Sequence, residues 1–287
     1  MRGLRQFSAG LLVVSVLVFA IFVIYTKTHA DTVGPQLYVD KDILKVSVKE
    51  DEKSLMTGIT ARDSQDGDVT KSLVIENMSN FTTKGRRLIT YAAFDSNGNV
   101  GKISREIQYT DYEPPHFIMK SAPEFSQSQL DKMEDYSSII QAEDCLDGDI
   151  SRNISMSQLG DYEESQFGGT QELEFKVSNS AGDVISLPVT VSYHEVGAPI
   201  VQLSSYITYI KKGTQFDPSG YLKKVQIGTD EYDMSEFRDK YKDQTMTIKN
   251  GVNTMESGNY TVSYTVTTGS GNQLRGSTVY LQVVVME

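Results

Sequence analysis

The feature that most constrains the fold is a set of three landmarks that recurs along the chain. A proline opens an extended segment at Pro35, Pro115 and Pro199, with separations of 80 and 84 residues. Later in each unit, one glycine stands six residues before an aromatic residue and another stands seven residues after it. These sets are Gly85, Tyr91 and Gly98; Gly169, Phe175 and Gly182; and Gly258, Tyr264 and Gly271. Because self-similarity at a fixed period indicates a repeat architecture, three copies of one structural unit are expected.

The segments around the aromatic landmarks have the pattern of β-strands. Residues 260–266 read YTVSYTV, which alternates between two faces with a period of two. The Asn-Gly pair of the first unit and the Ser-Gly pair of the third, which follow these strands, are typical of a hairpin turn, because glycine adopts positive φ freely. Helical periodicity is nearly absent. Units of about 80–90 residues with many short strands therefore predict an all-β fold of small sandwiches.

The first two units share a second block, at an offset of 81 residues. Residues 61–70 read ARDSQDGDVT, and residues 142–151 read AEDCLDGDIS. The pattern A-x-D-x-x-D-G-D-[VI]-[TS], followed by G-x5-[YF]-x6-G-[ND], resembles the bacterial immunoglobulin-like repeats of Gram-positive surface proteins, also appended to some pesticidal crystal toxins. The resemblance covers residues 35–287, although the third unit lacks the D-G-D block. It implies a cell-surface rod of sandwiches, adhesive or spacing in role, without implying one ligand.

An uncharged run of 19 residues, from Phe7 to Tyr25, lies near the N-terminus. A bilayer core takes about 20 apolar residues as a helix. Arg2 and Arg5 precede the run, so the positive-inside rule places the N-terminus in the cytoplasm and the bulk outside. The alternative is a signal peptide cleaved after Ala30, but the apolar region of such peptides spans about 7–15 residues. The expected location is the cell membrane, as a single-pass protein with an extracellular C-terminal bulk.

These features predict an all-β chain of three tandem immunoglobulin-like β-sandwich domains after one N-terminal transmembrane helix. The expected segments are a cytoplasmic stub at 1–6, an anchor at 7–25, a linker at 26–34, and domains at 35–111, 112–196 and 197–287, the last with an insertion near 228–250.

The charge and the cysteine content limit the kinds of partner and of disulfide that are expected. The chain has 27 Lys and Arg residues against 38 Asp and Glu residues, a net charge of −11. Such an acidic surface repels phosphate backbones, so no nucleic-acid partner is expected. The single cysteine, Cys145, allows no intramolecular disulfide. It is either a small apolar residue or a site of intermolecular pairing.

The aspartate blocks are the candidate metal ligands. Hard cations such as Ca²⁺ bind several carboxylate oxygens on a flexible loop. The candidate Ca²⁺ ligands are Asp63, Asp66 and Asp68 in the first unit and Asp144, Asp147 and Asp149 in the second. Asp95 or Asp111 could add a ligand. The alternative is that Asp-Gly-Asp is a turn in which the carboxylates accept backbone N–H groups. No other cofactor is expected.

The insertion of the third unit is the candidate partner site. Asp233 and Glu236 have the spacing of a capping box, which predicts a helix at about 234–242. Phe237 and Tyr241 share one helix face and would give a protein partner an apolar surface with an acidic rim. The alternative is that both aromatic side chains pack inward, since the apolar stripe of a surface helix faces its own core by default.

No catalytic constellation stands out in the sequence. The three histidines are His29, His116 and His194, and they form no metal-binding pair or triad motif. The chain is therefore expected not to be an enzyme. The predicted function is adhesion or ligand display by a membrane-anchored rod, with a protein or glycan partner outside the cell. The alternative is a spacer or accessory subunit of an envelope assembly or export machine.

Overall fold

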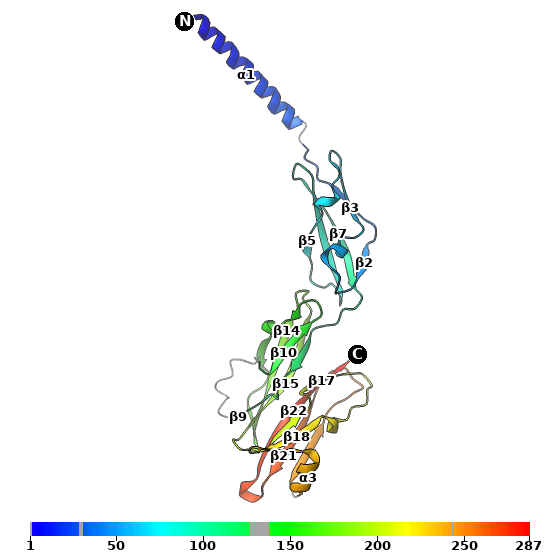
Figure 1. Cartoon of the computed structure of the whole chain (residues 1–287), viewed down its shortest axis with the longest axis vertical. Coiled ribbons are helices and arrows are strands. Elements are labelled where there is room, and N and C mark those ends of the chain that lie inside the picture. Colours follow the sequence, from blue (N-terminus) through cyan, green and yellow to red (C-terminus); the bar gives the residue numbers. More distant parts are fainter. Residues whose placement is uncertain (1, 29–30, 127–137, 243) are drawn as a thin grey trace. The chain divides into compact units, whose positions relative to one another are not determined.

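The computed structural model describes residues 2–28, 31–126, 138–242 and 244–287 (Figure 1). The chain divides into two compact units, Met1–Thr110 and Asp111–Glu287. Strands dominate both units, which confirms the all-β class. The division falls where the first and second domains were expected to meet. The boundary expected near residue 196 does not separate compact units, because the last two sandwiches share one unit.

The first unit begins with helix α1 (Arg2–Thr28), which contains the uncharged run of the sequence. Across the part of the chain that the structure describes, no helix combines the length and apolar character needed to cross a membrane. A transmembrane span at 7–25 therefore remains a prediction from the sequence.

The first sandwich packs a three-stranded sheet against a four-stranded one. The sheets have the orders β1-β3-β4 and β2-β7-β6-β5. Their strands are β1 (Gln36–Val39), β2 (Ile43–Val46), β3 (Ile59–Asp63), β4 (Gly67–Asp68), β5 (Val74–Met78), β6 (Arg86–Phe94) and β7 (Val100–Tyr109). Short helices α2 (Glu52–Leu55) and η1 (Thr70–Ser72) connect them.

The second sandwich repeats this plan. Its sheets have the orders β8-β10-β11 and β9-β15-β14-β12, with β13 also paired to β14. The elements are β8 (His116–Met119), β9 (Glu124–Ser126), β10 (Ile140–Asp144), β11 (Gly148–Asp149), η3 (Ser151–Asn153), β12 (Ser155–Gln158), β13 (Glu163–Ser165), β14 (Gly168–Ser178) and β15 (Val184–His194).

The third sandwich has the orders β16-β18-β19 and β17-β22-β21-β20. Its elements are β16 (Ile200–Leu203), β17 (Ile207–Lys211), η4 (Pro218–Tyr221), β18 (Leu222–Ile227), β19 (Asp230–Asp233), α3 (Met234–Lys240), β20 (Thr245–Asn250), β21 (Gly258–Thr268), η5 (Gly271–Gln273) and β22 (Arg275–Met286). The insertion forms β19 and α3, which packs against β18 and β19.

One topological feature is common to all three sandwiches. The first strand of each lies in the small sheet, and the next strand crosses to the large sheet and pairs in parallel with its last long strand. These parallel pairs are β2 with β7, β9 with β15, and β17 with β22. All other strand pairs within the described residues are antiparallel, so each repeat of the sequence corresponds to one copy of the same two-layer topology.

The aromatic landmark of each repeat lies in the core of its sandwich. Tyr91, Phe175 and Tyr264 are all buried. The Tyr91 hydroxyl donates to the carbonyl of Leu55 at 2.6 Å, and the Tyr264 hydroxyl donates to the carbonyl of Pro218 at 2.7 Å. A buried tyrosine hydroxyl needs such a partner. The landmark therefore ties its strand to a short helix, α2 in the first sandwich and η4 in the third, whereas phenylalanine in the second sandwich has no hydroxyl.

Within the second unit, the second and third sandwiches share a packed boundary. Ile207 of β17 belongs to the core cluster of the second sandwich, and Val284 of β22 packs against that cluster. The Tyr209 hydroxyl accepts a hydrogen bond from Phe117 N at 2.8 Å and donates to Phe117 O at 3.1 Å. These two sandwiches therefore meet through strands β17 and β22, and not only through a connecting segment as a simple rod would require.

Candidate metal centre

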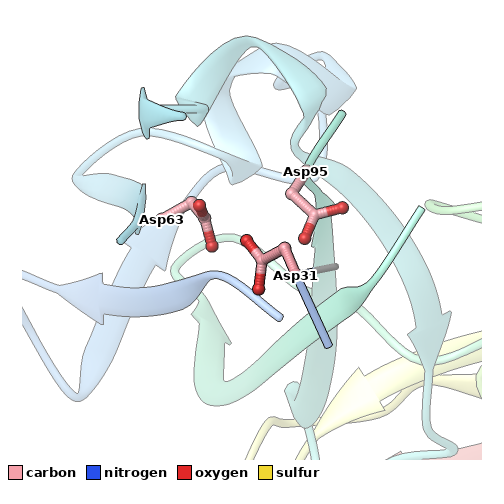
Figure 2. Close-up of side chains that lie close together, drawn as sticks. All are labelled: Asp31, Asp63 and Asp95. Atoms are coloured by element: carbon pink, nitrogen blue, oxygen red, sulfur yellow. The ribbon is translucent and has the colours of Figure 1, made fainter. Parts of the chain in front are cut away.

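Three aspartates from separate parts of the chain meet in the first sandwich. Asp31 lies before β1, Asp63 is the last residue of β3, and Asp95 follows β6. Each offers a carboxylate oxygen that lies within 4.8 Å of the other two, and each side chain points toward the others (Figure 2). Each residue is only 8% exposed. A buried cluster of like charges this close requires a compensating partner.

The D-x-x-D-G-D turn positions Asp63. One of its carboxylate oxygens accepts the N–H of Gln65 at 2.7 Å and that of Asp66 at 2.9 Å. Gly67 follows with a φ of +75°, a conformation that glycine adopts without strain. Hydrogen bonds from the backbone N–H groups of Asp66 and Gln65 lower the pKa of Asp63, so this carboxyl group is held in its charged form.

The hairpin turn after β6 positions Asp95. Its Oδ1 accepts the N–H of Asn97 at 2.9 Å and that of Asn99 at 2.8 Å. Its Oδ2 accepts the side-chain amide of Asn99 at 2.7 Å, and the same amide nitrogen donates to the carbonyl of Asp31 at 3.0 Å. Asn99 therefore links two of the three aspartates.

Two carboxylate oxygens in the cluster have no hydrogen-bond partner. Asp31 Oδ1 accepts the N–H of Val33 at 3.0 Å, but Asp31 Oδ2 is buried and unpaired. Asp63 Oδ2 is likewise buried and unpaired. Leaving a charged oxygen buried without a partner is costly, and the two orphaned atoms belong to side chains that face each other. A hard cation bound by all three carboxylates would satisfy both oxygens.

The other predicted ligands of the first block are turn residues. Asp66 Oδ2 accepts the N–H of Ser96 at 2.6 Å, and its Oδ1 accepts the Ser96 hydroxyl at 3.0 Å. Asp68 Oδ1 accepts the N–H of Thr70 at 3.0 Å, and hydrogen bonds from Thr70 lower the pKa of Asp68. Both residues are exposed. Their carboxylates fasten the turn and lie outside the cluster of Asp31, Asp63 and Asp95, and their role as cation ligands stays a prediction.

The block of the second sandwich makes the same turn. Asp144 Oδ1 accepts the N–H of Leu146 at 2.9 Å and that of Asp147 at 3.1 Å. Asp147 Oδ2 accepts the N–H of Ser180 at 2.6 Å. Asp149 Oδ1 accepts the N–H of Ser151 at 2.9 Å, and Ser151 lowers its pKa. Asp147 and Asp149 are therefore turn residues, like their counterparts in the first sandwich.

The buried position beside Asp144 has different neighbours. Asn179 stands where the first sandwich has Asp95, and its Nδ2 donates to Asp144 Oδ2 at 3.1 Å and to the Tyr112 hydroxyl at 3.0 Å. Tyr112 in turn donates to Asp183 Oδ2 at 2.6 Å, and burial together with Asp183 raises the pKa of Tyr112. Both oxygens of Asp144 are thus hydrogen-bonded. Ca²⁺ binding at Asp144 stays a prediction from the sequence, and the structure gives this carboxylate hydrogen-bond partners at both oxygens.

Sequence reasoning missed Asp31 and placed it in a linker. The signal was present in the offset of 80 residues between Pro35 and Pro115, which aligns Asp31 with Asp111. Asp111 was considered as an additional ligand, yet the structure leaves it exposed. Asp95, the other residue considered, is a member of the cluster. Throughout the described segments, the three-carboxylate arrangement of metal ligands is found at Asp31, Asp63 and Asp95 alone.

The residues of the predicted partner site lie on and beside α3, and partner binding there stays a prediction. Asp233 accepts the N–H groups of Ser235 and Glu236 at 2.8 Å, and Glu236 accepts the N–H of Asp233 at 3.1 Å, which confirms the capping box. Phe237 is only 1% exposed and belongs to the core of the third sandwich. Tyr241 stacks on Phe237 with ring centroids 5.4 Å apart and also packs against that core. The aromatic face therefore serves the sandwich itself.

Cys145 lies in the turn of the second block with its side chain exposed as a free thiol. Its Sγ donates to the carbonyl of Glu113 at 3.0 Å, and partial desolvation raises its pKa. A thiol whose pKa is raised is a poor nucleophile at neutral pH.

Comparisons with known proteins give a likeness without a family. No protein-family model matches the chain, and no curated protein matches it. Among solved structures, a Clostridium perfringens ZmpB fragment with CBM51-2 and INT domains aligns at 16% identity and a TM-score of 0.22, covering 50% of this chain and 30% of that one. Drosophila N-cadherin EC1-4 aligns at 10% identity and a TM-score of 0.21, covering 90% and 76%.

Extracellular domains 1–5 of protocadherin gamma B2 align at 11% identity and a TM-score of 0.20, covering 89% of this chain and 60% of that one. This chain thus spans less than two thirds of the ZmpB and protocadherin chains. These similarities carry no inference about function. The assignment of the fold rests on the strand topology described above.

Proposed function

We propose that this chain is a non-enzymatic, membrane-attached surface protein whose β-sandwiches are displayed outside the cell for adhesion or for binding a protein or glycan partner. The observation that carries this proposal is the threefold recurrence of one two-sheet topology behind a helix that contains 19 uncharged residues. Each sandwich supplies a scaffold on which binding function concentrates in loops.

Attachment and orientation rest on the sequence. The uncharged run from Phe7 to Tyr25 has the length of a bilayer span, and Arg2 and Arg5 precede it. The absence of disulfides within a chain that has one cysteine suits a bacterial surface protein, because small eukaryotic secreted domains more often carry several. The net charge of −11 disfavours nucleic acid as the partner.

A second candidate role is that of a spacer or accessory subunit in an envelope assembly. The packed boundary between the second and third sandwiches favours this spacer role, because Ile207 and Tyr209 of the third sandwich contact the second sandwich. A block of two sandwiches joined in this way resists bending more than two domains joined by a linker alone. In this role the chain would have the same membrane orientation as in adhesion, but its partner would be another envelope protein.

The test is expression of the full chain in bacterial cells, followed by fractionation and protease treatment of intact cells. The wild-type chain is expected in the membrane fraction, with its bulk removed by external protease. The matched control is Val14→Arg with Leu17→Arg, which breaks the uncharged run and is expected to abolish membrane retention. Recovery of the wild type in the cytosol, or full protection from protease, would refute the proposed location.

The partner is tested with the intact membrane protein. Cells that display the full chain are compared with cells that lack it for binding to immobilised matrix proteins and glycans. Binding that depends on the chain supports adhesion or display. Co-purification with other envelope proteins from native membranes, without such binding, supports the accessory role.

A further inference from the structure

We propose that Asp31, Asp63 and Asp95 bind one Ca²⁺ ion, that this site exists in the first sandwich and not in the second, and that the ion fastens the segment before β1 to the sandwich. The proposal does not depend on the function proposed above. It concerns a binding site and its mechanical consequence for the segment between α1 and the first sandwich.

Two unpaired carboxylate oxygens indicate a bound cation. Asp31 Oδ2 and Asp63 Oδ2 are buried without a hydrogen-bond partner, in side chains that are 8% exposed. The other oxygen of each residue accepts backbone N–H groups, and both side chains point toward the cluster (Figure 2). Three carboxylates with oxygens within 4.8 Å of one another repel one another, and a cation between them would turn this repulsion into attraction.

The chemistry of the donors selects the ion. All three side chains offer carboxylate oxygen, and the cluster contains no imidazole or thiolate, which Zn²⁺ prefers. The ligands come from three loops or strand ends, which suits the flexible coordination of Ca²⁺. Mg²⁺ demands near-ideal octahedral geometry and dehydrates reluctantly, so it usually retains several waters. We therefore expect Ca²⁺ to bind more tightly than Mg²⁺.

The second sandwich provides an internal comparison. It has the same turn around Asp144, and Asp144 is equally buried. There, the amide of Asn179 donates to Asp144 Oδ2, which leaves no orphaned oxygen and no third carboxylate in the cluster. The equivalent buried carboxylates, Asp63 and Asp144, therefore have different neighbours in the two sandwiches. One uses a neutral amide, and the other keeps a third carboxylate beside two unpaired oxygens, an arrangement that a bound cation would satisfy.

The position of Asp31 gives the site its mechanical consequence. Asp31 follows the region of α1 and precedes β1, so its carboxylate belongs to the connecting segment rather than to either sheet. The segment already lies close to β7, because a side chain at Gly34 would meet the carbonyl of Val100 at 2.5 Å. Asn99 also holds the carbonyl of Asp31. A bound ion adds a charged anchor at Asp31, whereas its removal leaves three carboxylates that repel one another.

The test is a Ca²⁺ titration of the full-length chain in detergent micelles, followed by calorimetry. Extracellular Ca²⁺ modules bind with dissociation constants of about 10⁻⁴–10⁻³ M, so the titration extends to about 10 mM. One ion per chain is expected, with weaker binding of Mg²⁺ in a parallel titration. Asp95→Asn is expected to weaken Ca²⁺ binding at least about tenfold, and Asp144→Asn, the matched control in the second sandwich, is expected to leave it unchanged.

Asp95→Asn is expected to fold, because Asn179 occupies the equivalent position and accepts the equivalent backbone N–H groups, from Ala181 and Asp183. Circular dichroism checks this, and Asp31→Asn serves as a second variant. No saturable binding, two equivalent ions per chain, or equal losses from Asp95→Asn and Asp144→Asn would each overturn the proposed site.

The fastening of the segment has its own readout. Hydrogen exchange at residues 31–35 is expected to slow when Ca²⁺ is added, and the N–H of Val33, which donates to Asp31 Oδ1, reports on it directly. The same comparison in Asp95→Asn should show no Ca²⁺ effect. Binding of one ion without added protection at 31–35 would overturn the fastening while leaving the site in place.

Discussion

Asn179 donates a hydrogen bond from Nδ2 to Asp144 Oδ2 at 3.1 Å, in the place where the first sandwich sets the carboxylate of Asp95 beside Asp63. One amide in place of one carboxylate thus separates a network in which both oxygens of Asp144 are hydrogen-bonded from a cluster with two orphaned oxygens. The surrounding turns are alike, so the two sandwiches form a natural pair of variants for measuring the effect of this difference.

Asn179→Asp is expected to destabilise the second unit. The substitution replaces the donor to Asp144 and Tyr112 with a like charge, and a buried polar group left without its partner costs about 1–3 kcal/mol. Urea unfolding of the full chain should show a lower midpoint for the second unit with an unchanged slope. An unchanged midpoint would mean that the amide does not stabilise the network.

Asp95→Asn should have the opposite effect in the absence of divalent cations. In EDTA the variant removes one of three mutually repelling carboxylates and supplies an amide that can donate to Asp63 Oδ2. The variant also loses the hydrogen bond that Asp95 Oδ2 accepts from the Asn99 amide, so we expect the first sandwich to gain at most about 1 kcal/mol, the typical net value of one hydrogen bond. With saturating Ca²⁺ the wild type should become the more stable of the two, because it binds the ion more tightly than the variant and gains more free energy from binding. Thermal unfolding in both buffers measures this crossover.

The stability of the second unit is expected to fall as the pH rises. Burial raises the pKa of Glu124 to about 8, while its ordinary value is 4.5. His194 Nε2 lies 3.5 Å from Glu124 Oε1, and Tyr206 is also near. Because the folded state holds the proton more tightly, the stabilisation is fully present below pH 4.5 and is lost as the pH rises through about 8.

The size of this loss is several kcal/mol at most, at about 1.36 kcal/mol for each unit of pKa difference. Urea unfolding between pH 5 and pH 9 measures it, and Glu124→Gln should flatten the profile. A profile that is equally steep in Glu124→Gln would assign the pH dependence to another group.

Phe237→Ala is expected to destabilise the third sandwich by about 3–5 kcal/mol, the usual cost of deleting a buried phenylalanine. Phe237 is fully enclosed by the core, and Tyr241 stacks on it. Arg238→Ala, an exposed change on the same helix, should cost little. Near-wild-type stability of Phe237→Ala, measured by urea unfolding, would restore the aromatic face of α3 as a candidate partner surface.

The repeat landmarks predicted the β class, because glycine turns and alternating strands are local properties of the sequence. The capping box at Asp233 was predictable for the same reason. The membership of the acidic cluster was not, because Asp31 reaches it only through tertiary packing along β7, and Asp66 and Asp68 leave it through hydrogen bonds within the turns. The packing of Tyr209 against Phe117 likewise depends on contacts between repeats, which no period in the sequence encodes.

Tyr209→Phe tests whether the second and third sandwiches unfold together. The hydroxyl bonds both the N–H and the carbonyl of Phe117, and burial raises the pKa of Tyr209 to about 12. Its removal leaves a buried backbone donor and acceptor without that partner, at a cost of about 1–3 kcal/mol. Tyr38→Phe, at a residue of the first sandwich that is 48% exposed, is the matched control and should cost almost nothing. In the wild type we expect one cooperative transition for residues 111–287, and in Tyr209→Phe an earlier or a divided one. Two separate transitions already in the wild type would show that the shared boundary does not couple the sandwiches.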